Sequence, residues 1–196
     1  AESLSLLLNN GVHHLYINVE QVRAFRTCSF FISCEPPLIL GGLKLNRSVL
    51  KFGGSSVSDF TKIKNIAEML KTRVEQGEEL IVVVSAMGKT TDQLMENVST
   101  LTSTPKDQEL ALLLTTGEQQ TVSYLSMVLN DIGVKAKAMT GYQAGIKTIG
   151  HHLKSKIAEI NPDTFNQAFE NNDVLVVAGF QGINDEFELT TLGRGG

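Results

Sequence analysis

Two short segments of the chain are apolar at every position. They are residues 80–84 (LIVVV) and 174–178 (VLVVA). A strand with one face in water alternates apolar and polar residues, whereas a strand covered on both faces carries apolar residues throughout. Segments of this length are also too short for an ordinary helix. The two segments therefore predict strands of a parallel sheet that is buried on both faces.

Helical patterns alternate with the predicted strands. A first helix is predicted to begin at Ser58 or Asp59 and to end at Gly77, with apolar residues at helical spacing between them. Strands are also predicted at residues 49–52 and 134–139. The other predicted helices are one capped by Asp92 that reaches residue 101, one capped by Asp107 that reaches residue 129 with an interruption at 115–118, and one over 161–169. This alternation predicts a three-layer α/β sandwich with a mainly parallel sheet.

The composition favours a globular protein that acts on small molecules. Of the 196 residues, 42% are hydrophobic and 19% are charged, which argues against a disordered chain and allows one or two modest domains. The sequence has no run of about 18 apolar residues, the length that a membrane helix needs. A net charge of −4 gives no sign of a basic face for nucleic acid. We therefore expect neither a membrane nor a nucleic acid as partner.

Residues 1–46 differ from the rest, and we treat them as an unassigned N-terminal extension before a domain at 47–196. The extension holds only six charged residues and both cysteines of the chain, Cys28 and Cys34. These could form a bridge or half of a metal site, but no second Cys or His pair has zinc-like spacing. Two free thiols in a reducing compartment are favoured. With no basic residues before residues 6–8 (LLL), we predict no signal peptide and a cytoplasmic protein.

Ligands of parallel α/β sheets bind at the carboxyl ends of the strands, so the loops there carry the chemistry. In the first loop, Gly53 and Gly54 let backbone amides converge on an anion, with hydroxyl donors on Ser55 and Ser56. Lys51 adds a charge for a phosphate, and the helix that follows adds its positive end. The structural alternative is an ordinary strand-to-helix turn with a solvated lysine.

The second loop, residues 85–92 (SAMGKTTD), is not a P-loop, because position 83 holds valine where that motif needs glycine. It still offers the hydroxyls of Ser85 and Thr91, although a capping turn would explain it as well. In the predicted helix break, Glu118 could hold a substrate ammonium, or simply stabilise a helix N-terminus.

The third loop begins at residue 179 and continues, after a predicted hairpin turn at residues 184–185, to the end of the chain. There Arg194 lies among glycines, and its guanidinium fork matches a carboxylate or phosphate. The alternative is a flexible glycine tail.

Together these pieces resemble the aspartate kinases of the amino-acid kinase superfamily. The resemblance covers about residues 48–196 and has matching order and spacing. It rests on residues 49–57 (VLKFGGSSV), 84–92 (VSAMGKTTD), 116–118 (TGE), 140–145 (TGYQAG), 177–182 (VAGFQG) and 190–196 (TTLGRGG). It implies the amino-acid kinase fold, ending here before the nucleotide-binding half. It also implies transfer of phosphate from ATP to the side-chain carboxylate of L-aspartate, the first step towards lysine, threonine and methionine.

The resemblance also assigns roles to residues. It implies ATP and L-aspartate as ligands, Mg²⁺ carried by ATP rather than by protein ligands, and a homo- or hetero-oligomer in the full-length protein. Lys51 and Arg194 are implied as catalytic. The implied ATP-phosphate contacts are Lys51, Gly53, Gly54 and Ser55, and the implied substrate contacts are Ser85, Thr91, Glu118, Arg194, Gly195 and Gly196.

Physical chemistry agrees with such a reaction. A carboxylate with an ordinary pKa of about 4 is ionised at neutral pH and needs no general base. It needs alignment and relief from repulsion between two anions. One cation about 4 Å from one anion, at a surface-like dielectric constant, contributes about 4 kcal/mol before the cost of desolvation. Loss of Lys51 or Arg194 is therefore expected to be severe.

Three features depart from the family pattern: the long segment before the first motif, Phe187 where glycine is expected, and the end of the chain at Gly196. Two alternatives stay open. One is a kinase for another carboxylate or carbamate, and the other is a non-catalytic fragment that binds an amino acid or a subunit.

We predict that the purified 196-residue chain binds ATP poorly and shows no measurable kinase turnover by itself, because the sequence motifs of a nucleotide-binding half are not among those found. The measurement is hydroxamate formation in the presence of ATP and L-aspartate. A hydroxamate signal that depends on both substrates would contradict this prediction.

Overall fold

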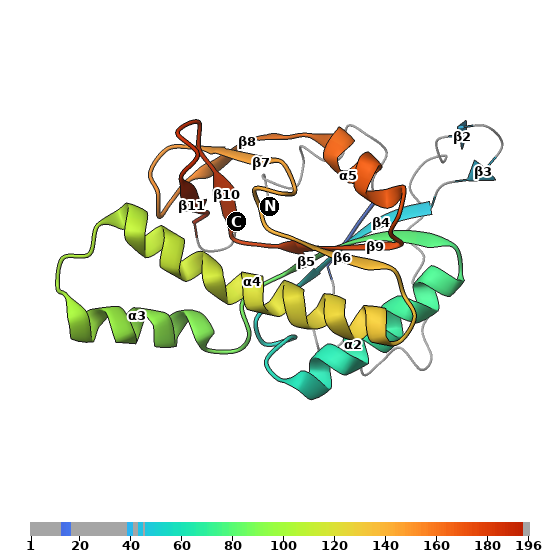
Figure 1. The fold of residues 1–196 in the computed structure, drawn as a ribbon, viewed down its shortest axis with the longest axis horizontal. Helices are drawn as coiled ribbons and strands as arrows, with labels where there is room; N and C mark the ends of the chain where they lie inside the picture. Colours follow the sequence, from blue (N-terminus) through green and yellow to red (C-terminus); the bar gives the residue numbers. More distant parts are fainter. Residues whose placement is uncertain (1–12, 17–38, 41–42, 45, 194–196) are drawn as a thin grey trace.

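The structure, a computed structural model, describes residues 13–16, 39–40, 43–44 and 46–193. Its centre is a five-stranded sheet whose neighbouring strands all run parallel (Figure 1). In spatial order the strands are β1 (His13–Tyr16), β4 (Asn46–Phe52), β5 (Glu78–Val84), β9 (Val174–Ala178) and β6 (Ala136–Met139). The two apolar segments are thus adjacent central strands of a parallel sheet, as the sequence predicts.

Helices and a second sheet cover the two faces of this central sheet. The helices are α2 (Phe60–Glu75), α3 (Thr90–Leu101), α4 (Asp107–Asp131) and α5 (Pro162–Phe169). The second sheet has the order β11 (Leu189–Thr191), β10 (Gln181–Ile183), β7 (Ile146–Ile149) and β8 (Lys156–Ile160). In Figure 1, α2 and α4 lie on one side of the central sheet, with α5 and the second sheet on the other. A short pair, β2 (Ile39–Leu40) and β3 (Leu43–Lys44), completes the described strands.

The core consists of two apolar clusters, one on each face of the central sheet. Along β5, Leu80, Val82 and Val84 pack with the residues of α2 and α4. On the opposite face, Ile81 packs with Phe165 and other residues of α5. Alternate residues of β9 divide between the two clusters in the same way. Because both faces are covered, no position in these strands can be polar without a buried partner, which explains the continuous apolar runs.

The predicted ends of the first helix are confirmed. The Asp59 carboxylate accepts a hydrogen bond from the Lys62 backbone amide at 2.9 Å and so caps α2. After the helix, Gly77 adopts a φ of +86° and donates to the Val74 carbonyl at 2.8 Å. Glycine adopts this left-handed conformation without steric cost.

The predicted break in α4 is wrong, because the helix is continuous from Asp107 to Asp131 and contains Gly117 and Glu118. A glycine inside a helix costs only about 1 kcal/mol, which tertiary packing offsets. Two predicted caps are also wrong: Asp107 is the first residue of α4, and Asp92 lies in the first turn of α3. Both carboxylates still lie at a helix N-terminus, where the helix dipole favours them.

The strand predictions were incomplete. The strand predicted from residue 134 begins at Ala136, because Val134 donates to Leu129 and closes the end of α4. The sequence analysis did not predict β1, β7 or β8. The hairpin turn at residues 184–185 is confirmed, since β10 and β11 are antiparallel and flank it. Phe187, found where glycine was expected, is exposed and adopts a left-handed φ of +62°.

Several of the predicted features cannot be compared with the structure, because they lie outside the described residues. These are Cys28, Cys34, Arg194, Gly195 and Gly196. Within the described part, no helix is long and apolar enough to cross a membrane.

We predict that truncating a leucine of the two-faced core destabilises the fold far more than truncating an exposed one. Leu70 on α2 is fully buried, whereas Leu101 at the end of α3 is 84% exposed. Leu70→Ala should lower the free energy of unfolding by about 2–5 kcal/mol, because it removes buried methyl groups and leaves a cavity. Leu101→Ala should change it by less than about 0.5 kcal/mol. Urea denaturation measures both, and equal effects would contradict the assigned core.

Candidate functional site

Three neighbouring strands of the central sheet end at the same level. The register pairs Phe52 of β4 with Val84 of β5, and Val84 with Ala178 of β9. The residues that follow are also hydrogen-bonded: the Ser85 amide donates to the Phe52 carbonyl at 3.1 Å, and the Gly179 amide donates to Val84 at 2.9 Å. The parallel register therefore brings the beginnings of all three predicted loops to one edge of the sheet.

The first two loops pack directly against each other through glycines. The Gly88 amide donates to the Gly54 carbonyl at 3.1 Å, and a Cβ at Gly54 would lie 2.9 Å from the Ala86 carbonyl oxygen. Only glycine fits at position 54 without a shift of the backbone. Gly53 is exposed with open space around it, and its carbonyl accepts from the Ser56 amide at 2.8 Å. Gly54 thus joins the loops, while Gly53 forms their exposed turn.

Two lysines lie at the glycine-rich loop, and the sequence analysis identified only one. Lys51 is half-buried, next to the last residue of β4. Lys62, on α2, was missed: its Nζ donates to the exposed Ser55 carbonyl at 2.9 Å and to the Ser58 hydroxyl at 2.7 Å. Lys62 follows Ser58 by four residues, so the two side chains lie on the same side of the chain where α2 begins. This spacing in the sequence could have identified Lys62.

The positive end of α2 is matched by a carboxylate of the chain itself. The hydrogen bond from the Lys62 backbone amide holds the pKa of Asp59 below its usual value, with further help from the Ser58 hydroxyl. Asp59 is therefore ionised at neutral pH. The positive end of the α2 dipole therefore stabilises the Asp59 carboxylate before it stabilises a bound anion. We expect the loop amides and the lysines to make the main contribution to anion binding.

Glu118 is a buried carboxylate that faces the loop after β5. Its side chain is only 3% exposed, and Oε1 accepts from the Ala86 amide at 3.1 Å. The other oxygen, Oε2, is buried and has no hydrogen-bond partner within the described residues. A Cβ at Gly117 would lie 2.8 Å from the Ala86 Cβ, so glycine at this position is what allows α4 to approach the loop.

Burial governs the charge of this carboxylate. Loss of solvent raises the pKa of Glu118 to about 7, and the hydrogen bond from Ala86 opposes that rise. The residue lies in the middle of α4, so the alternative that it stabilises a helix N-terminus is wrong. A buried carboxylate oxygen without a donor is costly. A cationic group that reached Oε2 would stabilise the ionised form.

Other predicted substrate contacts lie close to Glu118. Ser85 is half-buried, one residue before the Ala86 amide that Glu118 binds. Thr91 is half-buried in the first turn of α3. Its neighbour Thr90 would lie 3.5 Å, through its methyl carbon, from a Cβ at Gly117. One side of the candidate site therefore consists of the second loop, the start of α3 and the turn of α4 that carries Glu118.

The third loop reaches the same edge and then leaves it as a hairpin. Phe180 adopts a left-handed φ of +64°, which for a bulky residue is strained. Its carbonyl accepts from the Leu192 amide at 2.9 Å, so the returning strand ends beside the sheet edge. Gly193 is the last described residue here, and Arg194, Gly195 and Gly196 follow it outside the described part. Their predicted roles stay predictions.

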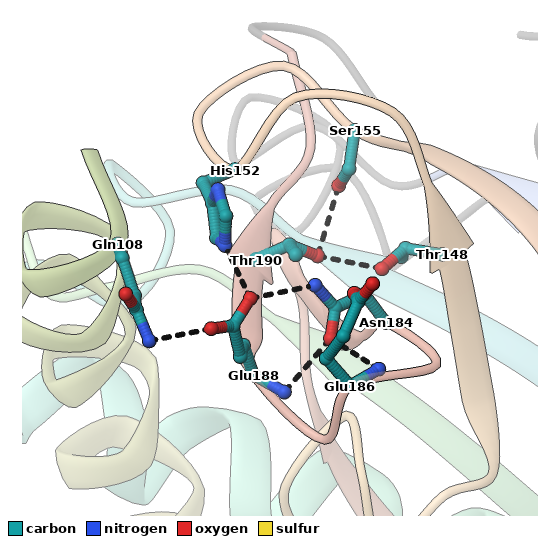
Figure 2. Close-up of polar contacts among 8 residues, drawn as sticks. All are labelled: Gln108, Thr148, His152, Ser155, Asn184, Glu186, Glu188 and Thr190. Atoms are coloured by element: carbon teal, nitrogen blue, oxygen red, sulfur yellow. Dashed lines mark hydrogen bonds and ion pairs between the residues drawn. The ribbon is translucent and has the colours of Figure 1, made fainter.

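A polar network centred on Glu188 fixes this hairpin, as Figure 2 shows. The Glu188 carboxylate accepts from Gln108 at 2.6 Å and Asn184 at 3.0 Å, and lies 2.8 Å from His152 Nε2. The hydrogen bonds from Asn184 and His152 hold the pKa of Glu188 below its usual value. The hairpin is thereby tied both to the N-terminal end of α4 and to the segment before β8.

Hydroxyl groups hold the base of the hairpin. The buried Thr190 hydroxyl lies 2.7 Å from that of Thr148 and accepts from Ser155 at 3.0 Å (Figure 2). Ser155 also donates to the Thr191 carbonyl at 2.9 Å. The segment that leads towards residue 194 is therefore held from two sides up to Leu192.

No group of three or more His, Cys, Asp or Glu side chains with the arrangement of a metal site occurs in the described ranges. The groups that could meet a phosphate are lysines, hydroxyls and backbone amides.

The sequence of residues 46–196 matches the amino acid kinase family. This chain belongs to that family. It is 43% identical over 148 residues to aspartokinase 2 of Bacillus subtilis and 45% identical over 148 residues to the aspartokinase of Thermus thermophilus. Each match covers 76% of this chain and 36% of the relative, so the chain spans about a third of the length of these curated relatives. The resemblance to aspartate kinases is confirmed.

Solved structures agree on the fold. Aspartate kinase from Synechocystis is 40% identical, with a TM-score of 0.61 over 76% of this chain and 24% of that one. E. coli aspartokinase III in complex with aspartate and ADP matches with a TM-score of 0.63 over 77% of this chain and 44% of that one. At 19% identity the second likeness shows the fold alone. The predicted α/β sandwich with a mainly parallel sheet is therefore confirmed.

We predict that Glu118 makes the stability of the chain depend on pH. Its pKa is raised from 4.5 in the unfolded chain to about 7 in the folded one. The folded protein thus keeps a proton that the unfolded chain releases, and stability falls as pH rises between these values. Relative to Glu118→Gln, the wild type should lose about 3 kcal/mol of unfolding free energy across this range. Denaturation at pH 4.5 and pH 8 measures it, and parallel profiles would contradict the prediction.

Proposed function

We propose that this chain forms the amino-acid-binding part of an aspartate kinase, which transfers a phosphoryl group from ATP to the side-chain carboxylate of L-aspartate. The observation that carries the proposal is the buried Glu118, whose Oε2 has no partner within the described residues. An α-ammonium group has the charge and the donors that this oxygen lacks. The similarity to aspartokinases supports the choice of aspartate among amino acids.

The anion half of the proposal rests on the first loop. Lys51 and the amides of Gly53, Gly54 and Ser55 bind the ATP phosphates, and Mg²⁺ arrives on the nucleotide. Lys62 supports them by holding the Ser55 carbonyl at 2.9 Å, which fixes the exposed end of the loop. E. coli aspartokinase III, whose structure contains aspartate and ADP, shares this fold.

In the proposed reaction, an oxygen of the aspartate side chain attacks the γ-phosphorus as the bond to the β-phosphate breaks. ADP leaves, and 4-phospho-L-aspartate forms. The attacking carboxylate is already ionised, so the site supplies alignment and charge neutralisation rather than a base. Ser85, Thr91 and Glu118 orient the amino acid, while Arg194 with Gly195 and Gly196 binds its carboxylate.

The cellular setting is part of the same proposal. The reaction is the first step towards lysine, threonine and methionine, in the cytoplasm, within a homo- or hetero-oligomer. Residues 47–196 form the domain that binds the amino acid. The segment 1–46, unassigned from the sequence, contributes β1 (His13–Tyr16) to the central sheet of that domain.

We predict that the chain binds L-aspartate and that Glu118→Gln weakens binding about 10- to 100-fold, because hydrogen bonds to a charged partner contribute about 1.5–3 kcal/mol. Isothermal titration calorimetry measures the dissociation constants. Glu109→Gln, an exposed carboxylate in the first turn of α4, is the matched control and should bind as the wild type does. Succinate, which lacks the ammonium group, should bind weakly to every variant.

Equal affinity of the wild type for succinate and L-aspartate would contradict the proposed site. The reaction itself is tested on the gene product that carries this sequence, by ADP release with L-aspartate or L-glutamate as acceptor. Preference for glutamate would contradict the proposed substrate.

A further inference from the structure

Gln181, the first residue of β10, is a polar side chain with no exposed surface. Both ends of its amide are hydrogen-bonded: Oε1 accepts from the Gly141 amide at 3.3 Å, and Nε2 donates to the Thr115 carbonyl at 3.0 Å. A buried amide is costly unless its groups are paired, so this geometry is strongly specified. Neither hydrogen bond has a place in the proposed chemistry.

The amide joins three parts of the structure that meet near the sheet edge. Gln181 lies on the strand after the third loop, Gly141 follows the end of β6, and Thr115 lies within α4. Thr115 is also fully buried and precedes Glu118 by three residues, so the two share one face of the helix. The bond to Thr115 therefore acts on the same helical turn that carries the Glu118 carboxylate.

Glycines allow the segments around the Gln181 amide to pack closely. A side chain at Gly141 would collide with the backbone of Gln181, and one at Gly182 would collide with Thr148. On the other side of the helical turn, Gly117 lies against Ala86. The turn of α4 at residues 115–118 is thus held between the loop after β5 and the Gln181 amide.

We propose that Gln181 is a positioning residue that fixes the height and rotation of α4, so that Oε2 of Glu118 is presented to the substrate ammonium. This inference rests on the proposed function. It assigns to the glutamine of the segment 179–182 (GFQG) the role of connecting the third loop to the amino-acid site. Displacement of a binding group by about 1 Å is enough to cost up to about 100-fold in a site of this kind.

The far end of α4 offers a control for the loss of a side-chain tether, at a residue that is exposed rather than buried. Asn130 also uses a side-chain amide to tie the helix to the central sheet: Nδ2 donates to the Ala136 carbonyl at 2.9 Å, and Oδ1 accepts from the Ala136 amide at 3.1 Å. It lies roughly 18 Å along the helix from Glu118, given a rise of about 1.5 Å per residue. Loss of this amide removes a tether of the same kind without touching the turn that carries Glu118.

The test compares Gln181→Met with Asn130→Leu, two changes that keep the approximate shape and remove the hydrogen bonds. Three quantities are measured: the dissociation constant for L-aspartate by calorimetry, the pKa of Glu118 by carboxyl carbon NMR, and the midpoint of urea denaturation. We expect both variants to unfold at lower urea concentration. Only Gln181→Met should weaken L-aspartate binding, by about tenfold or more, and bring the pKa of Glu118 down towards its usual value as water reaches the carboxyl.

Gln181→Leu is the second variant, because it removes both hydrogen bonds with a branched apolar side chain in place of the flexible methionine. It should weaken L-aspartate binding in the same direction. Wild-type affinity and an unchanged Glu118 pKa in the folded Gln181 variants would overturn the inference, as would an equal loss of affinity in Asn130→Leu. The pKa measurement needs no ligand. Failure of the wild type to bind L-aspartate would therefore count against the proposed function, while the Glu118 pKa in Gln181→Met still decides the positioning role.

Discussion

A hydrogen bond from the Ala86 amide to the buried Glu118 carboxylate connects the central sheet to α4. Ala86 lies just beyond β5, whose register with β4 and β9 fixes where its backbone ends. Gly117 removes the side chain that would otherwise keep the helix away. The level strand ends and the close helix together place loops, hydroxyls and one carboxylate at a single edge. The rest of the candidate site is arranged around this contact.

The same contact carries an energetic cost that is informative about function. A carboxylate that has a pKa of about 7, and one oxygen of which has no hydrogen-bond partner in the described part of the chain, stabilises the fold less than a well-packed apolar residue would. Proteins retain such groups where activity depends on them. In the proposed function, the ammonium group of an amino acid binds this oxygen. The polar network of Glu188 holds the hairpin of β10 and β11 in place.

The local sequence was enough to predict the central strands, because strands that are buried on both faces consist of apolar residues throughout. It was also enough for the Asp59 cap and for the location of the loops. It failed where distant contacts decide: α4 continues through Gly117 because that glycine faces Ala86, and Gln181 has partners 40 and 66 residues away. The short strands β7 and β8 mix polar with apolar residues and carry too weak a pattern. The roles of Lys51 and Arg194 stay predictions.

The most direct measurement of the central claim is a crystal structure of the chain with L-aspartate bound. The α-ammonium nitrogen should lie about 2.7–3.2 Å from Oε2 of Glu118, with the side-chain carboxylate directed towards the glycine-rich loop at Gly53 and Gly54. An amino acid bound elsewhere, or one whose carboxylate rather than ammonium faces Glu118, would contradict the claim that this buried oxygen binds the ammonium group of the substrate.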